Sequence, residues 1–501
     1  MTIIMKKLHR QFIESTPTPR GSWAKRGSIL PADIKFLIPS RGGMAKAWVG
    51  LLLGICLLAT FSAHAAGETQ TTPQGWPDRL TINCDLPFMA KQADVSAADS
   101  AQTPASAQPR VTPPIFSAPA AAYSPQATPR LQAAGPETNA FQIRIYGYIK
   151  LDAAYDTQRA QNGDYIYYVF PKINGVSDNE FNMTAKETRL DLEIISPDIG
   201  STRVKGNLEV DFYGQSGTAN SPNLRMRLAY VTVVNEDIGS LMAGQDWDTF
   251  ITVRPRMNNV AILADAGALG VRRPQLRLSK ALKFSKDTKI VASAAAARTI
   301  GADLDNGGQE DGVDAGFPSA QYNLCLETKS WTEKTAKVSV SGHWGMETLD
   351  QISTNGVVIA SDKEWYTSYS VMGSLLLPIM SRVSLQGAVW QGQDLTSYYG
   401  GIGQGINSKL HTAIAAQGGW AEFLFDITKR INLNLGYGLD APSQSDLNAN
   451  DRSRNETLFT TLYYTIKPIT FAVEYVNMTT SYKNAASATD HRVQGSVIFT
   501  F

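Results

Sequence analysis

The sequence has few cysteines, no excess of either charge and almost no helical periodicity. The chain of 501 residues contains three cysteines, too few for a disulfide scaffold, and they lack the spacing of metal ligands. Lys and Arg total 46 while Asp and Glu total 45, which gives a formal net charge of +1. This balance excludes a nucleic-acid binder that depends on bulk positive charge. We therefore expect no nucleic-acid partner, no cofactor and no metal centre.

Residues 44–66 have the features of a secretory signal peptide. Lys46 lies in a short basic start, an apolar run covers residues 49–61, and Ala63 and Ala65 form a small-x-small cleavage site. The apolar run has about a dozen residues, fewer than the roughly 18 to 20 that cross a bilayer as a helix. A retained membrane anchor is therefore the weaker alternative. Lipidation of Cys56 is disfavoured as well, because a bulky isoleucine precedes it.

Two further segments lie outside the predicted folded domain. Residues 1–43 are basic, and they are either the result of a start codon assigned too early or an extended leader. Residues 67–138 are rich in Pro, Ala, Ser, Thr and Gln, so they cannot bury enough apolar surface to offset their chain entropy. We predict a disordered Pro/Ala-rich linker at residues 67–138 and one folded domain at residues 139–501.

The folded domain contains repeated runs in which apolar and polar side chains alternate. In the first run, at about 141–155, Ile143 and Ile145 alternate with Arg144, so one face is apolar and the other is charged. The runs have about nine to eleven residues, the length of a tilted membrane crossing, whereas strands of soluble proteins average about five or six. Their number, about sixteen, is even, as in bacterial outer-membrane barrels.

The connections between these runs alternate between long and short. A loop of about 27 residues follows the first run, and a turn at residues 196–200 follows the second, at about 183–195. Long loops on one side and tight turns on the other are typical of an outer-membrane barrel with both termini in the periplasm. We therefore predict an all-β fold, a transmembrane antiparallel β-barrel of about 16 strands with a disordered N-terminal tail. Its predicted location is the outer membrane of a Gram-negative bacterium.

The last predicted strand, at about 491–501, ends in an aromatic residue. Val497, Phe499 and Phe501 lie on one face of it. We interpret this run as a membrane-facing closing strand, with Phe501 exposed for the barrel insertion machinery. The alternative is an ordinary last strand that ends in Phe by chance.

Short motifs in this order along the chain resemble those of the general trimeric porins, and most closely those of the DcaP-like porins. The motifs are YGYIKLD at 146–152, TRL at 188–190, LEVDF at 208–212, GQ at 244–245 and RPQLR at 273–277. The resemblance covers about residues 141–501, and it implies a passive, homo-trimeric channel for small, often anionic solutes. The N-terminal tail departs from the family pattern, because it is proline-rich where those porins tend to have a coiled-coil helix.

The third long connection, from Asp246 to about residue 271, is the segment that such porins fold into the lumen. Charged residues occur within it and on the strands beside it, and a charge on the lipid face would cost about 2 to 4 kcal/mol. The predicted pore-lining and constriction residues are Arg225, Arg227, Asp246, Asp248, Arg254, Arg256, Arg272, Arg273 and Arg277. We consider two interpretations: a basic ladder that attracts anions, or a wall of compensating ion pairs with Asp191, Glu209 and Asp211.

Other chemistry is not expected. The loop at 303–314 resembles a calcium loop in part, but Gly307 and Asp314 break the EF-hand pattern, so we interpret it as a solvated external loop. His343 is interpreted as a wall residue and Cys325 as a free thiol. No grouping of serine, histidine and carboxylate suggests an enzyme, although sequence alone does not exclude a barrel enzyme.

These features predict a porin for the passive diffusion of small hydrophilic solutes, with anionic solutes favoured and the third external loop narrowing the lumen. Its expected partners are these solutes, outer-membrane lipid and two further copies of the chain. The alternative function is a β-barrel that anchors its proline-rich tail to the cell wall or to a partner.

Overall fold

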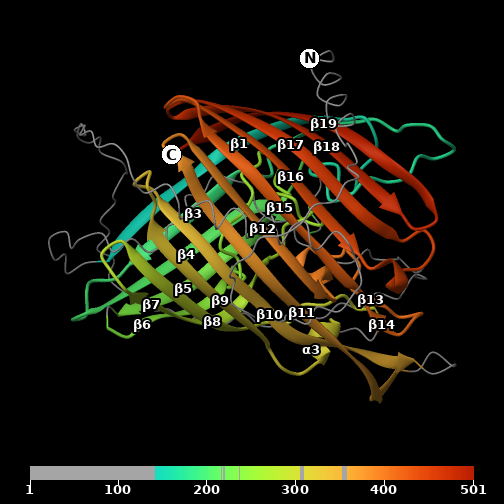
Figure 1. Cartoon of the computed structure of the whole chain (residues 1–501), viewed down its shortest axis with the longest axis horizontal. Helices are drawn as coiled ribbons and strands as arrows, with labels where there is room; N and C mark the ends of the chain where they lie inside the picture. Colours follow the sequence, from blue (N-terminus) through green and yellow to red (C-terminus); the bar gives the residue numbers. More distant parts are fainter. Residues whose placement is uncertain (1–140, 216, 218–219, 236, 305–309, 353–357) are drawn as a thin grey trace, which may run out of the picture. The chain divides into compact units, whose positions relative to one another are not determined.

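The computed structural model describes residues 141–501 apart from residues 216, 218–219, 236, 305–309 and 353–357. The predicted leader (1–43), signal peptide (44–66) and linker (67–138) therefore lie outside the described residues. The described chain forms one large antiparallel β-sheet that closes on itself (Figure 1). No helix among the described residues is long and apolar enough to cross a membrane.

Seventeen strands form the large sheet, and a two-stranded sheet, β13–β14, lies in one of the connections. In chain order the strands are β1 (Gln142–Asp156), β2 (Glu180–Thr184), β3 (Arg189–Ile195), β4 (Thr202–Gly214), β5 (Asn223–Asn235), β6 (Gly239–Trp247), β7 (Arg272–Lys283), β8 (Thr288–Ala297), β9 (Ser319–Lys329), β10 (Thr335–Ile352), β11 (Val358–Met380), β12 (Val383–Gln393), β13 (Ile406–Asn407), β14 (Thr412–Ala413), β15 (Ala415–Asp426), β16 (Ile431–Pro442), β17 (Arg452–Ile466), β18 (Ile469–Tyr482) and β19 (Ala485–Thr500). The short helices are α3 (Asp311–Asp314), η1 (Thr396–Tyr398) and η2 (Gln444–Asp446).

The seventeen strands make sixteen positions around the barrel, because β2 and β3 occupy one position. Both pair with β1: Asp152 is opposite Thr184 on β2, and Tyr148 is opposite Arg189 on β3. The ring closes where β19 pairs with β1, with Thr500 opposite Tyr148. The prediction of a closed antiparallel barrel of about sixteen strands is confirmed. The predicted second strand is one crossing that residues 185–188 interrupt.

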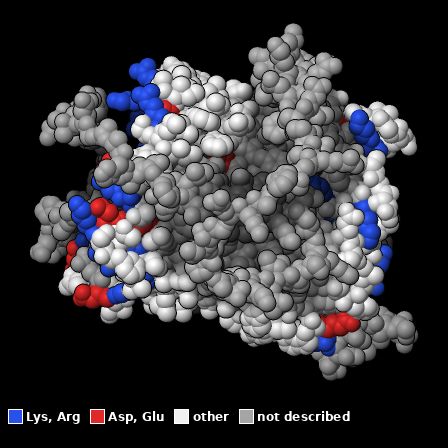
Figure 2. Space-filling model, in the orientation of Figure 1, with Lys and Arg blue, Asp and Glu red and all other residues white. Residues whose placement is uncertain are grey.

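Apolar side chains lie on the outside of the barrel, and polar side chains lie on the inside. On β1, Ile149 and Leu151 are 55% and 45% exposed, whereas Lys150 and Asp152 are 2% and 4% exposed. Where the described outer surface is visible in Figure 2, charged side chains gather toward its two ends and the surface between them is mostly uncharged. An outer face of this kind is suited to hydrocarbon, since a charge at the bilayer midplane costs about 2 to 4 kcal/mol.

The last strand, β19, begins earlier than the predicted start at about residue 491. Between about residues 479 and 491, β18 and β19 continue as a hairpin in which Tyr482 pairs with Ala485. Asn484 has a left-handed φ of 60°, as a tight turn requires, and the hydroxyls of Thr479 and Thr489 form a 2.9 Å cross-strand hydrogen bond. The predicted start was too late because small polar residues on both faces of this segment give no apolar alternation, although they pair as a strand.

Candidate constriction site

The connection between β6 and β7, residues 248–271 and here named L3, lies inside the barrel. Its first residues follow the inner wall. The Thr249 amide donates a 2.7 Å hydrogen bond to Gln321 on β9, and Ser341 on β10 donates a 2.7 Å hydrogen bond to the Phe250 carbonyl. Gln321 and Ser341 are 2% and 0% exposed, so L3 covers inward-facing wall residues from the point where it leaves β6.

The middle of L3 continues along the wall to strands far from β6. Gln386 on β12 donates a 2.9 Å hydrogen bond to the Arg254 carbonyl, and Asn434 on β16 donates a 2.7 Å hydrogen bond to the Arg256 carbonyl. Both are side-chain amides, which reach backbone groups that a loop leaves unpaired. L3 thus follows the inside of the barrel from β9 to β16.

A buried carboxylate holds residues 258–259, near the midpoint of L3, against the wall. Glu474 on β18 is 0% exposed and accepts the backbone amides of Asn258 at 2.6 Å and Asn259 at 2.8 Å. Thr461 on β17 donates a third hydrogen bond to the same carboxylate at 2.6 Å. The ammonium of Lys150 on β1 donates to the Asn258 carbonyl at 2.8 Å. We name these three side chains, Glu474, Thr461 and Lys150, the L3 clamp; hydrogen bonds to charged groups contribute about 1.5 to 3 kcal/mol each.

The return half of L3 packs against the connection between β12 and β15, residues 394–414 and here named L6. The Asp265 amide donates a 3.0 Å hydrogen bond to the Tyr399 carbonyl in L6. Gly267 has a φ of 123°, and a Cβ there would collide with the Gly419 carbonyl oxygen on β15. Only glycine allows the backbone this conformation and this close approach to the wall.

Aromatic side chains join L3 to two other external loops. The tyrosines come from the β1–β2 connection, from β4 and from L6, and they surround small residues of L3. The members are Tyr165, Tyr167, Tyr399, Val260, Ala261 and Ala264, with Tyr168, Tyr213 and Val271 packed beside them. Ring pairs such as Tyr167 and Tyr399, with centroids 5.4 Å apart, contribute about 0.5 to 1.5 kcal/mol beyond their burial. L3, L6 and the β1–β2 connection therefore pack against one another.

Arginines gather on the inner wall formed by β3, β4 and β5. Arg225 forms an ion pair with Asp211 at 2.5 Å, and Arg227 forms ion pairs with Asp211 at 3.1 Å and with Glu209. Arg189 lies 3.7 Å from Glu209. All five side chains are at most 9% exposed. Asp191 on β3 is 6% exposed and lies opposite Glu209 on β4, so this part of the wall holds three guanidinium groups and three carboxylates.

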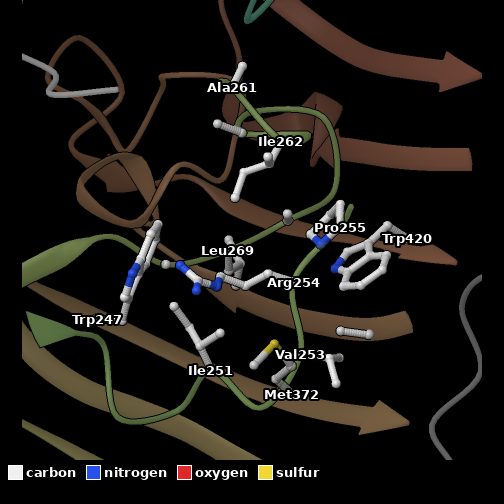
Figure 3. A pocket seen from close by; sticks show the side chains of 14 residues that line it. Trp247, Ile251, Val253, Arg254, Pro255, Ala261, Ile262, Leu269, Met372 and Trp420 are labelled. Atoms are coloured by element: carbon white, nitrogen blue, oxygen red, sulfur yellow. The ribbon is translucent and has the colours of Figure 1, made fainter. Parts of the chain in front are cut away.

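Two more arginines, Arg254 in L3 and Arg272 at the start of β7, contact the ring of Trp247. The guanidinium of Arg254 lies 4.0 Å from the Trp247 ring centroid, and that of Arg272 lies 4.9 Å from it. Figure 3 shows the Arg254 side chain extending toward Trp247 across a pocket lined by Ile251 and Leu269. Burial, with a further contribution from Arg227, lowers the pKa of Arg254 to about 10, so it stays protonated at neutral pH. We name Arg189, Arg225, Arg227, Arg254 and Arg272 the basic cluster.

The other predicted charges at the root of L3 form compensated pairs. Asp248 and Arg273 lie 2.7 Å apart and both side chains are 0% exposed. Arg273 also donates to the Ser397 carbonyl at 2.9 Å and stacks 3.9 Å from the Tyr398 ring, so it joins L3 to L6. Asp246 and Arg277 lie 3.1 Å apart on neighbouring strands.

The structure thus divides the nine predicted site residues into three groups. Arg225, Arg227, Arg254 and Arg272 belong to the basic cluster; Asp246, Asp248, Arg273 and Arg277 form the pairs at the root of L3; and Arg256 has an exposed side chain. Sequence reasoning did not assign Arg189, Lys150 or Glu474 to the site. Each of the three lies at an inward-facing position of an alternating strand, and this position can be inferred from the sequence.

His343 and Cys325 lie on the inner wall, as expected. His343 is 2% exposed and its ring nitrogens lie 2.7 Å from the Ser370 hydroxyl and 3.1 Å from the Ser368 hydroxyl. Cys325 is a free thiol. Within the part of the chain that the structure describes, no group of three His, Cys, Asp or Glu side chains is arranged to hold a metal ion.

Comparisons with known proteins show that the chain is similar to an outer-membrane channel. Residues 133–314 match the model of the DcaP outer membrane protein family. The outer membrane channel DcaP of Acinetobacter baumannii is similar in structure, with a TM-score of 0.57 and 21% identity over 74% of this chain and 100% of that chain. The anion-selective porin from Comamonas acidovorans gives a TM-score of 0.47 and 10% identity over 72% of this chain and 100% of that chain. No curated protein sequence matches the chain.

The family match covers residues 133–314, and the structural match covers 74% of the chain. The apolar outer face and the polar inner face of the barrel described above agree with a membrane-spanning barrel. These findings confirm the resemblance to the DcaP-like porins: residues 133–314 match a family of outer membrane proteins, in agreement with the predicted outer-membrane location, and the chain has the β-barrel fold of an outer-membrane channel.

Proposed function

We propose that the protein is a diffusion channel for small hydrophilic anions, with L3 narrowing the lumen beside the basic cluster. The observation that carries this proposal is the charge ratio on one wall, where five guanidinium groups accompany three carboxylates, those of Asp191, Glu209 and Asp211. The carboxylates offset part of the positive charge and hold the guanidinium groups in place. The remaining net positive charge acts on a permeating solute through the electric field of the wall.

The path of L3 supports the position of the narrowing. The loop is held to the inner wall on β9, β10, β12, β16 and β18, so it occupies part of the cross-section of the barrel. Arg254 approaches the basic cluster from L3, and the other cluster members come from the wall. Clustered charges between low-dielectric walls focus the electric field and raise the local concentration of ions of opposite sign.

Compensating ion pairs are the competing interpretation of this wall. Asp211 contacts both Arg225 and Arg227, and Glu209 lies near Arg189 and Arg227, so each of these two carboxylates is shared between two cations. Asp191, the third carboxylate considered, accepts a 2.7 Å hydrogen bond from Asn207. A neutral wall would need one carboxylate for each guanidinium. The shared arrangement favours an anion-attracting wall over a neutral one.

Ion selectivity in planar bilayers tests the proposal. At low salt, where the Debye length is about 10 Å or more, the wild-type reversal potential in a KCl gradient is expected to show chloride preference. A unit charge about 7 Å from a permeating ion contributes about 0.6 kcal/mol in water, favourable for chloride and unfavourable for potassium. Arg254→Gln should therefore lower the chloride-to-potassium permeability ratio roughly sevenfold.

The matched control is Lys289→Gln, which removes a positive charge that is paired with Glu327 at 3.1 Å, away from L3. This control should leave the permeability ratio near the wild-type value. Cation preference of the wild-type channel at low salt, or an equal effect of both substitutions, would reject the basic cluster as the selective element.

Homo-trimer formation and recognition of Phe501 by the barrel insertion machinery belong to the same proposal. The Phe501 backbone pairs with Gly147 of β1 at 3.1 Å, and its side chain is 45% exposed on the outside of the barrel. Cross-linking in native membranes and truncation of Phe501 test these two points. The alternative role as an anchor for the proline-rich tail stays a prediction, because residues 67–138 lie outside the described structure.

A further inference from the structure

Four cationic side chains lie on three neighbouring short turns, at the end of the barrel where β1 begins and β19 ends. Arg382 lies in the β11–β12 turn, Lys429 and Arg430 lie in the β15–β16 turn, and Lys467 lies in the β17–β18 turn. All four residues are exposed. We name Arg382, Lys429, Arg430 and Lys467 the basic arc; it is separate from L3 and from the basic cluster.

Hydrogen bonds hold these turns next to one another. The guanidinium of Arg382 donates a 3.3 Å hydrogen bond to the Ile427 carbonyl, and the Asp426 amide donates a 2.8 Å hydrogen bond to the Arg382 carbonyl. On the other side of the β15–β16 turn, the Thr465 amide near the end of β17 donates a 2.8 Å hydrogen bond to the Arg430 carbonyl. The basic arc is therefore continuous over the three turns.

Carboxylates do not neutralise the basic arc. Among the described residues, its four members form no ion pair with a carboxylate. The carboxylate beside the arc, that of Asp426, lies 3.1 Å from the ammonium of Lys334, which compensates it. Elsewhere on the same rim, Asp198 and Arg203 at the β3–β4 turn form an ion pair at 2.5 Å. Uncompensated positive charge is therefore present at the turns of β11 to β18.

Aromatic side chains lie on the outer face of the barrel beside the basic arc. The rings of Phe423 and Phe425 stack at the end of β15 with centroids 6.1 Å apart, and Tyr464 on β17 lies opposite Phe471 on β18. Phe423, Tyr464 and Phe471 are all exposed. Aromatic side chains form girdles at the membrane–water interfaces of outer-membrane barrels. The turns next to these rings therefore lie at the depth of lipid headgroups.

Exposed apolar side chains flank the same cations. Met380 precedes the β11–β12 turn, Ile427 lies in the β15–β16 turn and Ile466 precedes the β17–β18 turn, and all three are exposed. A soluble anionic polymer would leave these side chains in water, whereas acyl chains would cover them. Lys and Arg side chains that start from apolar surface extend their charged ends toward the headgroups. This combination favours a lipid over a soluble anion.

We infer that the basic arc binds the headgroups of anionic phospholipids, in the membrane leaflet on the short-turn side that is predicted to be periplasmic. Guanidinium and ammonium groups donate charge-assisted hydrogen bonds to phosphate oxygens, and one guanidinium can bind two oxygens of the same phosphate. A zwitterionic headgroup carries its own cation, so it gains less from the arc than an anionic one. Lipid binding at this rim is independent of the ion selectivity of the lumen.

Native mass spectrometry of the purified protein in a neutral detergent tests this inference. Phosphatidylglycerol and phosphatidylcholine with the same acyl chains are added in equal amounts, and the wild type should bind phosphatidylglycerol preferentially. Each Lys or Arg beside an anionic lipid surface strengthens binding about fivefold. The double variant Lys429→Gln/Arg430→Gln should therefore lower the ratio of the two association constants about 25-fold, and Lys467→Gln alone should lower it about fivefold.

The matched control is Arg203→Gln, which removes a guanidinium of the same rim that is already paired with Asp198. This control should keep the wild-type lipid preference, and heat modifiability on gels checks the folding of every variant. The inference is overturned if the wild type binds both lipids equally, if the double variant keeps the preference, or if Arg203→Gln loses it. Cosedimentation with purified peptidoglycan that requires Lys429 and Arg430, without a lipid preference, would overturn it in favour of an anionic polymer.

Discussion

The L3 clamp gives the sharpest prediction about how the channel keeps its width. Glu474 accepts two backbone amides of L3 and the Thr461 hydroxyl, all at 2.6 to 2.8 Å and away from solvent. In Glu474→Gln the side chain keeps its size, but one carboxylate oxygen becomes an NH₂ group that cannot accept the amide of Asn258 or Asn259. At least one buried amide is then left without a partner.

The expected magnitude follows from these contacts. Leaving a buried donor unsatisfied costs about 1 to 3 kcal/mol, and the remaining bonds lose their charge-assisted character. A change of about 2 kcal/mol shifts the equilibrium between bound and released states of residues 258–259 at the L3 clamp roughly 30-fold. The barrel should still fold, because the wall contacts of L3 on β9, β10, β12 and β16 are unchanged.

Single-channel recording measures this shift. Glu474→Gln should increase open-channel current noise and add conductance sublevels, and limited proteolysis should cut L3 faster than in the wild type. The matched control is Glu327→Gln, which removes an inner-wall carboxylate that pairs with Lys289 and Lys337. Wild-type noise and wild-type protease resistance in Glu474→Gln would refute the assignment of the clamp.

Three other predictions concern L3 and the outer face of the barrel. Burial raises the pKa of Asp265 to about 7. Its protonated form therefore stabilises L3 fully below about pH 4, and this stabilisation is lost as the pH rises through 7, so protease should cut L3 faster at pH 8 than at pH 4. Asp265→Asn should remove this pH dependence. Gly267→Ala should lower the unfolding midpoint in heat-modifiability gels, because its Cβ would meet the wall backbone at a φ of 123°. Leu435→Arg on the outer face should destabilise the barrel in vesicles by about 2 to 4 kcal/mol in urea titrations, whereas an unchanged midpoint would place residue 435 away from lipid.

The sequence predicted the barrel because its signal is local and repeated. Ile149 and Leu151 point outward and Lys150 points inward for the same reason that any strand alternates, and no distant contact is needed to establish this. The same alternation placed Arg225 and Arg227 on the inner wall. It also gave the strand count, since each crossing needs its own alternating run of about nine to eleven residues.

The sequence was least informative where alternation stops or where both faces are polar. Residues 185–188 interrupt one predicted strand, and the residues around Asn484 extend two strands through a segment that resembled a loop. In both places small or polar side chains fit a strand and a loop equally well. Pairing with a neighbouring strand, as between Tyr482 and Ala485, decided the outcome.

What the sequence determined by itself is the sidedness of each strand and, from it, an all-β barrel with a polar interior. Only the tertiary structure decided which polar side chains meet inside, because the partners are far apart in the chain. Glu474 and Asn258 are 216 residues apart, and Lys150 and Asn258 are 108 residues apart. Ring closure brings these strands around one lumen, and L3 then contacts whichever inward side chains lie along its path.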